Sequence, residues 1–166
     1  IVDINLDSIS TEKFVFHDNT REATITVNDY YTNDPVETKI TNVDFEDPWE
    51  NAAIDVLYST GKVYDFMKEK FNFKSLDNNN FPLVANVGRN IYNNAFWNGR
   101  NTNFGSGDCH KYSPFTTIDI VGHEFAHGIT DFNADLIYQG ESGALNESFS
   151  DIIGKILEKW AQPAKF

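Results

Sequence analysis

The sequence predicts an α+β fold, in which an N-terminal antiparallel β-rich lobe with one packed helix leads into a central helix and a following helix. Short segments rich in β-branched and aromatic residues, separated by turn residues, occupy the first part of the chain. Apolar residues recur at helical spacing after Pro48 and again in the last third. We expect a lobe at 1–112 and a helical part at 113–166, because Ser113-Pro114 suits a helix start.

The first strands are expected to pair as antiparallel hairpins. Residues 13–17 and 23–27 are strand-like, and Asp18-Asn19-Thr20-Arg21 between them has turn chemistry. His17 is expected on the surface of a strand and not in a metal site. Two more strands are predicted at 83–87 and 90–97, whereas the glycine- and asparagine-rich segment 99–107 is expected to be a loop.

Three helices are predicted from their apolar faces. The first begins at Pro48 with Asp47 as a candidate N-cap. We interpret its stripe as core packing: Ala53, Val56, Leu57, Val63, Tyr64, Met67 and Phe71. The second, from Ser113 to about Asn133, should bury Ile118, Val121, Phe125 and Ile129. The third, from about Ser142 to Trp160, should pack through Leu145, Phe149, Ile152, Ile153, Ile156 and Leu157.

Composition limits the function classes. With 166 residues, 40% of them hydrophobic, the chain can bury a real core. A net charge of −12 disfavours nucleic acids and anionic membranes as partners, since both attract basic patches. No apolar run approaches the roughly 20 residues of a membrane span. A single cysteine, Cys109, excludes an internal disulfide.

The segment His123-Glu124-Phe125-Ala126-His127 has the spacing of a metal site. Residues four apart share one face of a helix, so the two imidazoles can take adjacent corners of a tetrahedral zinc site. Glu124 then sits beside the metal, where it can take a proton from a bound water. A helix with two solvated histidines is the alternative.

A second pair, Glu147 and Asp151, begins 20 residues after His127. Glu147 can serve as third zinc ligand, and Asp151 can accept the N–H of a ligating histidine. Two histidines and a glutamate leave one position open to water, which is the catalytic pattern of zinc sites. A solvated acidic helix face is the alternative.

Three segments together resemble the thermolysin-like neutral metalloproteases: 92–99 (YNNAFWNG), 123–131 (HEFAHGITD) and 138–151 (YQGESGALNESFSD). The resemblance implies a zinc-dependent endopeptidase that acts on protein or peptide substrates. It implies His123, His127 and Glu147 as zinc ligands and Glu124 as general base. It also implies that the chain is secreted and works outside the cell, since the family is made as a secreted precursor.

The resemblance extends to further residues. It implies that Asp151 orients a ligand, that Tyr138 stabilises the oxyanion, that Asn94, Ala95 and Asn146 contact substrate with Trp97 as cleft wall, and that Asp119 and Glu158 bind calcium. Asp44, Glu46 and Asp47 are either part of another calcium site or solvated loop charges. Cys109 and His110 depart from the family's pattern, and we expect them in a loop.

The family continues into a helical domain that supplies an oxyanion histidine and part of the substrate pocket. No histidine follows His127 in this chain. We therefore expect the metal-bearing N-terminal part of such a protease: one piece of a cleaved enzyme whose second chain carries the rest, a truncated piece, or a divergent member completed by something else. The alternative is a catalytically incomplete zinc-binding fragment that acts as an interaction module.

Overall fold

The computed structural model describes residues 7–10, 13–30, 32–34, 37–39, 48–88, 93–108 and 110–162. Asp44, Glu46, Asp47 and Cys109 lie outside these residues, so the predictions made for them remain predictions. Within the described part of the chain, no helix is long and apolar enough to cross a bilayer.

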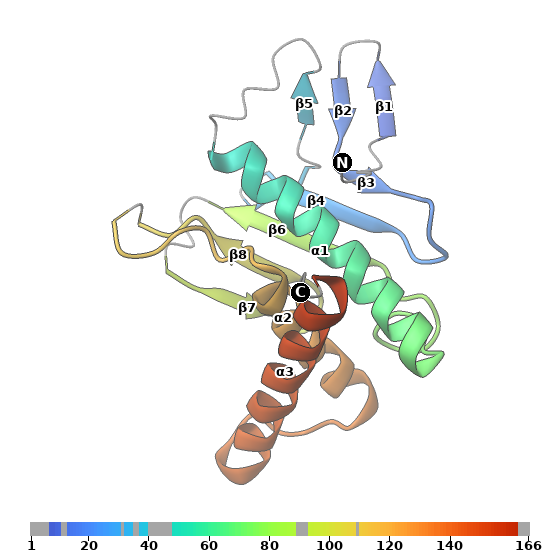
Figure 1. Ribbon diagram of the computed structural model, residues 1–166, viewed down its shortest axis with the longest axis vertical. Coiled ribbons are helices and arrows are strands. Elements are labelled where there is room, and N and C mark those ends of the chain that lie inside the picture. The colour runs from blue at the N-terminus through green and yellow to red at the C-terminus, as the bar shows by residue number, and fades with distance from the viewer. Residues whose placement is uncertain are drawn as a thin grey trace.

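The strands form two sheets (Figure 1). A three-stranded antiparallel sheet has the order β1-β2-β5, with β1 at Asp7–Ser10, β2 at Lys13–Val15 and β5 at Glu37–Lys39. The five-stranded sheet has the order β3-β4-β6-β8-β7, with β3 at His17–Asp18, β4 at Ile25–Asp29, β6 at Leu83–Gly88, β7 at Ala95–Trp97 and β8 at Thr102–Gly105.

The predicted hairpin pairing is confirmed for the first strands, since His17 on β3 faces Thr26 on β4 in an antiparallel pair. The prediction that the whole lobe is antiparallel is wrong. The β4 and β6 strands pair in parallel, and so do β6 and β8. Parallel neighbours need a long crossover, and the helix between β4 and β6 in the chain provides it.

The strand β8 lies in the segment that was expected to be a loop. Its four residues are all buried between β6 and β7. Polar side chains of the two strands pair there, since Asn86 Nδ2 donates to Asn103 Oδ1 at 2.9 Å. The polar composition of 99–107 therefore did not indicate that the segment contains an interior strand of the sheet. Of the strand predicted at 90–97, residues 95–97 form β7, and residues 90–92 lie outside the described part of the chain.

The first helix, α1, spans Pro48–Phe71, which confirms the predicted start. Its predicted stripe is buried, except that Phe71 is 56% exposed. In Figure 1, α1 crosses in front of the five-stranded sheet, and it packs against β4, β6 and the two later helices.

The second helix, α2, spans Ile118–Asn133 and buries all four predicted apolar residues. It starts later than the predicted Ser113. Phe115 N donates to Gly105 O at 2.9 Å, which ties the preceding segment to β8.

The third helix, α3, spans Gly140–Ala161 and extends away from the sheet (Figure 1). It meets α2 where Gly122 and Gly154 face each other: a Cβ added at Gly154 would lie 2.4 Å from Asp119 O. The predicted packing face is only partly right. Ile153 and Leu157 are buried, but four residues of that face are 37–57% exposed: Leu145, Phe149, Ile152 and Ile156. These four side chains lie beside the contact between Gly122 and Gly154 and are not covered by it.

Candidate metal centre

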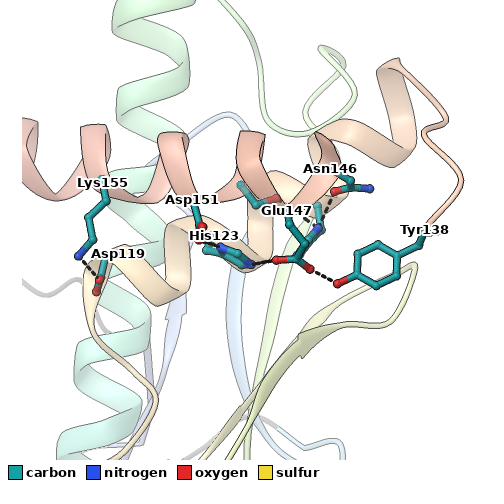
Figure 2. Close-up of polar contacts among 9 residues, drawn as sticks. Asp119, His123, Tyr138, Asn146, Glu147, Asp151 and Lys155 are labelled. Carbon is teal, nitrogen blue, oxygen red and sulfur yellow. Dashed lines mark hydrogen bonds and ion pairs between the residues drawn. The ribbon is translucent and has the colours of Figure 1, made fainter. Parts of the chain in front are cut away.

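Three side chains from α2 and α3 converge on one point (Figure 2). His123 Nε2 lies 3.1 Å from His127 Nε2 and 3.3 Å from Glu147 Oε2, and His127 Nε2 lies 3.6 Å from Glu147 Oε1. Zinc bonds of about 2.0–2.1 Å in a tetrahedron place neighbouring ligand atoms about 3.3 Å apart. The two imidazole nitrogens and the Glu147 carboxylate thus fit three corners of a zinc site. Among the described residues, no other histidine, cysteine or acidic group forms such a cluster.

The outer nitrogens of both histidines face oxygen acceptors. His123 Nδ1 lies 2.9 Å from Asp151 Oδ1, and His127 Nδ1 lies 2.7 Å from Asn146 Oδ1. These acceptors favour the proton on Nδ1, so each Nε2 presents a lone pair to the other and to a carboxylate. A cation is what makes such an arrangement stable. The chemistry of the donor set therefore fits a metal ion.

The contact of Asn146 with His127 was missed from the sequence, which suggested only a substrate contact. Asn146 is 2% exposed, and Ser150, fully buried, places Oγ 3.2 Å from the same His127 nitrogen. A signal was present. Asn146 and Ser150 are four apart on α3, one position before the pair Glu147 and Asp151, so the two pairs serve the two histidines.

Glu124 lies beside the three converging atoms and is 7% exposed. Burial raises the pKa of its carboxyl to about 7; the backbone N–H of Trp97 opposes this, and the charge of Glu147 adds to it. A carboxyl that titrates near neutral pH can both accept and return a proton.

Trp97 is held against α2 at three points. Its backbone N–H binds Glu124, and its indole Nε1 donates to Asp131 Oδ2 at 2.6 Å. Between these two residues on the same helix face is Gly128, where an added Cβ would come within 3.2 Å of the indole ring. The absence of a side chain at Gly128 leaves room for the ring against the helix. Neither Gly128 nor Asp131 was assigned a role in the sequence analysis.

A cavity of about 530 Å³ opens over these residues. Its walls include all the residues predicted to contact substrate, together with the metal cluster: Asn94, Ala95, Trp97, Asn146, His123, Glu124, His127, Tyr138 and Glu147. The Tyr138 side chain is exposed, and its hydroxyl donates to Glu147 Oε1 (Figure 2). The β7 strand, at the edge of its sheet, forms one side of the cavity.

The other predicted positions lie away from this cavity. His17 is on β3 as predicted, with Nε2 2.9 Å from Asn19 Oδ1. His110 is exposed. Asp119 and Glu158 come together at the other end of the contact between α2 and α3, with the ammonium of Lys155 between them.

Comparison with known proteins identifies the family. Residues 1–131 match the model of the thermolysin metallopeptidase catalytic domain, and residues 134–166 match that of the thermolysin metallopeptidase alpha-helical domain. The chain belongs to the thermolysin family of metallopeptidases. The predicted division at residue 112 remains a prediction.

Relatives and a solved structure agree with this placement. The chain is 40% identical over 158 residues to bacillolysin from Bacillus cereus, covering 91% of the chain and 28% of the relative. It is 46% identical over 116 residues to thermolysin from Alicyclobacillus acidocaldarius, covering 68% of the chain and 21% of the relative. The precursor of protealysin, a metalloproteinase from Serratia proteamaculans, superposes with a TM-score of 0.72 at 35% identity over 84% of the chain and 44% of that structure.

These comparisons confirm the predicted family and the α+β class. The chain spans less than a third of the length of the two curated relatives. What the whole proteins do is therefore a matter for proposal in this chain.

Proposed function

We propose that this chain carries the zinc-binding part of an endopeptidase, which hydrolyses peptide bonds with water. The observation that supports this most is the convergence of His123, His127 and Glu147 at tetrahedral spacing, with Glu124 buried beside them. Membership of the thermolysin family supports it independently.

Each side chain has a distinct task in this proposal. A zinc ion at the site would polarise the scissile carbonyl and lower the pKa of water to about 7. Glu124 accepts a proton from the attacking water and delivers it to the amine nitrogen as the C–N bond breaks. Tyr138 turns its hydroxyl from Glu147 to the carbonyl oxygen, where negative charge develops. Asp151 and Asn146 keep the two imidazoles oriented.

The substrate would bind as an extended strand along β7. This strand pairs with β8 on one side only among the described residues, and Asn94 and Ala95 line the cavity on the other. A peptide can add to such an edge through main-chain hydrogen bonds, and this mode is sequence-tolerant. Trp97 would form the wall of the cleft, and a substrate contact of Asn146 remains a prediction.

The remaining predictions are also proposals. We expect the protein to be secreted and to work outside the cell. A further polypeptide, carrying helical structure, would cover the exposed face of α3 formed by Leu145, Phe149, Ile152 and Ile156. Calcium at Asp119 and Glu158 is a prediction of the family resemblance.

Two substitutions test the zinc chemistry. Glu147→Ala should lose zinc, whereas Glu124→Gln should keep one zinc per chain. In an active preparation, Glu124→Gln should hydrolyse a fluorogenic peptide slower by on the order of 10²–10⁴-fold. Glu141→Gln, an exposed glutamate in the first turn of α3, is the matched control. Full zinc content in Glu147→Ala, or zinc loss in Glu124→Gln, would overturn the assignment.

The exposed face of α3 also favours a second candidate function, a zinc-binding interaction module without catalysis. In this candidate function the chain binds zinc and a partner through that face and does not hydrolyse peptides. A zinc-loaded chain that stays inactive when a helical-domain polypeptide is added would support the module. Restored hydrolysis would support the protease.

A further inference from the structure

A lysine stands where the family resemblance implies a calcium ion. Asp119 lies in the first turn of α2, and Glu158 lies near the end of α3. Lys155 Nζ lies 2.6 Å from Asp119 Oδ2 and 3.1 Å from Glu158 Oε2 (Figure 2 shows the contact with Asp119). One ammonium group therefore bridges both carboxylates.

The helix contact explains why these three groups meet. Gly154 lies directly against Asp119, since a Cβ added at Gly154 would be 2.4 Å from Asp119 O. Lys155 is the next residue on α3, and Glu158 is three residues further on the same face. The glycine contact thus brings the stem of Lys155 to Asp119.

The carboxylate of Asp119 is engaged on both oxygens. Thr117 Oγ1 donates to its Oδ1 at 2.6 Å, and Lys155 binds its Oδ2. Burial raises the pKa of Asp119, but the hydrogen bonds from Lys155 and Thr117 outweigh it and leave the pKa below its usual value. Asp119 is thus a charged group that already has a cation.

The described groups fit an ammonium better than calcium. Calcium takes six to eight oxygen ligands, whereas an ammonium is satisfied by up to three acceptors and one or two negative charges. Here Lys155 binds two carboxylates, and the Thr117 hydroxyl occupies the other oxygen of Asp119. The charge of Lys155 itself repels a divalent ion.

We propose that Lys155 is the built-in counter-cation of Asp119 and Glu158, so that the contact between α2 and α3 is maintained without calcium, which can bind there only by displacing the ammonium. The side chain of Lys155 is 67% exposed, so the displacement needs no unfolding. The inference does not depend on peptide hydrolysis.

The test compares the thermal stability of the whole chain with and without calcium. All proteins carry Glu124→Gln to suppress self-digestion. The buffer is freed of calcium on a chelating resin and then given one equivalent of zinc. Lys155→Ala and Lys155→Gln are compared with Lys159→Ala, which removes the same charge one turn later on the exposed side of α3. Calcium binding is measured by titration calorimetry.

We expect millimolar calcium to leave the midpoint temperature of the Glu124→Gln protein and of Lys159→Ala unchanged within about 1 °C, and to raise that of both Lys155 variants by about 2–4 °C. Their calcium affinity should exceed that of the Lys155 protein about tenfold or more, since a nearby positive charge is removed. An equal calcium response with and without Lys155 would overturn the proposal. The proposal would also be overturned if calcium stabilised the protein that retains Lys155 and if Asp119→Asn abolished that stabilisation.

Discussion

The two helices that carry the candidate metal ligands are buried to different degrees. In α2, ten of sixteen residues are buried, including His127 and Glu124, whereas in α3 only six of twenty-two are. Those six form a single stripe: Gly143, Asn146, Ser150, Ile153, Gly154 and Leu157. The histidines are thus fixed by the core on several sides. Glu147 and Asp151 are fixed mainly by the seam along which α3 touches α2.

Apolar content alone therefore does not decide how deeply each helix is buried. Both helices are rich in large apolar residues, yet α3 leaves four of its own exposed. Substitutions in α2 should therefore damage fold and site together, and many substitutions in α3 should affect the site or the surface alone.

The largest difference in stability is expected between substitutions of one phenylalanine in each helix. Phe125 on α2 is fully buried, and Phe149 on α3 is 37% exposed. Phe125→Ala should lower the free energy of unfolding by about 3–5 kcal/mol, and Phe149→Ala by about 1 kcal/mol or less. Urea unfolding of both zinc-loaded variants measures this. Equal losses would show that α3 is as much part of the core as α2.

The seam itself can be broken at Gly154. Replacing a helical glycine with alanine normally stabilises by up to about 1 kcal/mol. Gly154→Ala should instead destabilise by about 1–3 kcal/mol and weaken zinc binding, because its Cβ meets the backbone oxygen of Asp119. Comparing Ser148→Gly with Ser148→Ala on the exposed side of α3 gives the ordinary glycine–alanine difference. A stabilising Gly154→Ala would mean that the helices separate freely.

Substitutions at Asp151 and Asn146, which contact the two histidines, should have different effects on stability. Asp151 is exposed, so Asp151→Ala should weaken zinc binding about 10- to 100-fold and leave the free energy of unfolding of the zinc-free chain unchanged. Asn146 is buried, so Asn146→Ala should weaken zinc binding similarly and also reduce stability, because His127 loses a buried partner. Chelator competition and urea unfolding distinguish these effects. Unchanged zinc affinity in Asp151→Ala would count against its role.

The smallest effect on stability is expected on the exposed face of α3. Ile152 is 53% exposed, so Ile152→Glu should change stability by about 0.5 kcal/mol or less. It should reduce self-association of the chain, measured by light scattering across a concentration series. Ile153→Glu, on the buried neighbour, is the matched control and should unfold the protein. A monomer before and after Ile152→Glu would leave this face without an associating role.

The sequence predicted those features that depend on local spacing. The i, i+4 pairs identified His123, His127, Glu147 and Asp151, and the apolar stripe with Pro48 identified α1. It could not reveal β8, because Asn86 and Asn103 can form their hydrogen bond only after β6 and β8 are paired. Nor could it reveal that Trp97 depends on Gly128 and Asp131, since that contact joins β7 to α2 across the fold.

Under the proposed function, the position of β7 at the sheet edge would restrict which target proteins are hydrolysed. If a substrate must add to β7 as an extended strand, a segment that is already paired in its own fold cannot bind until it is released. The hydrolysis of a folded target would then follow the equilibrium population of its locally opened form. Two targets with the same cleavage sequence would be cut at rates set by their own local stability.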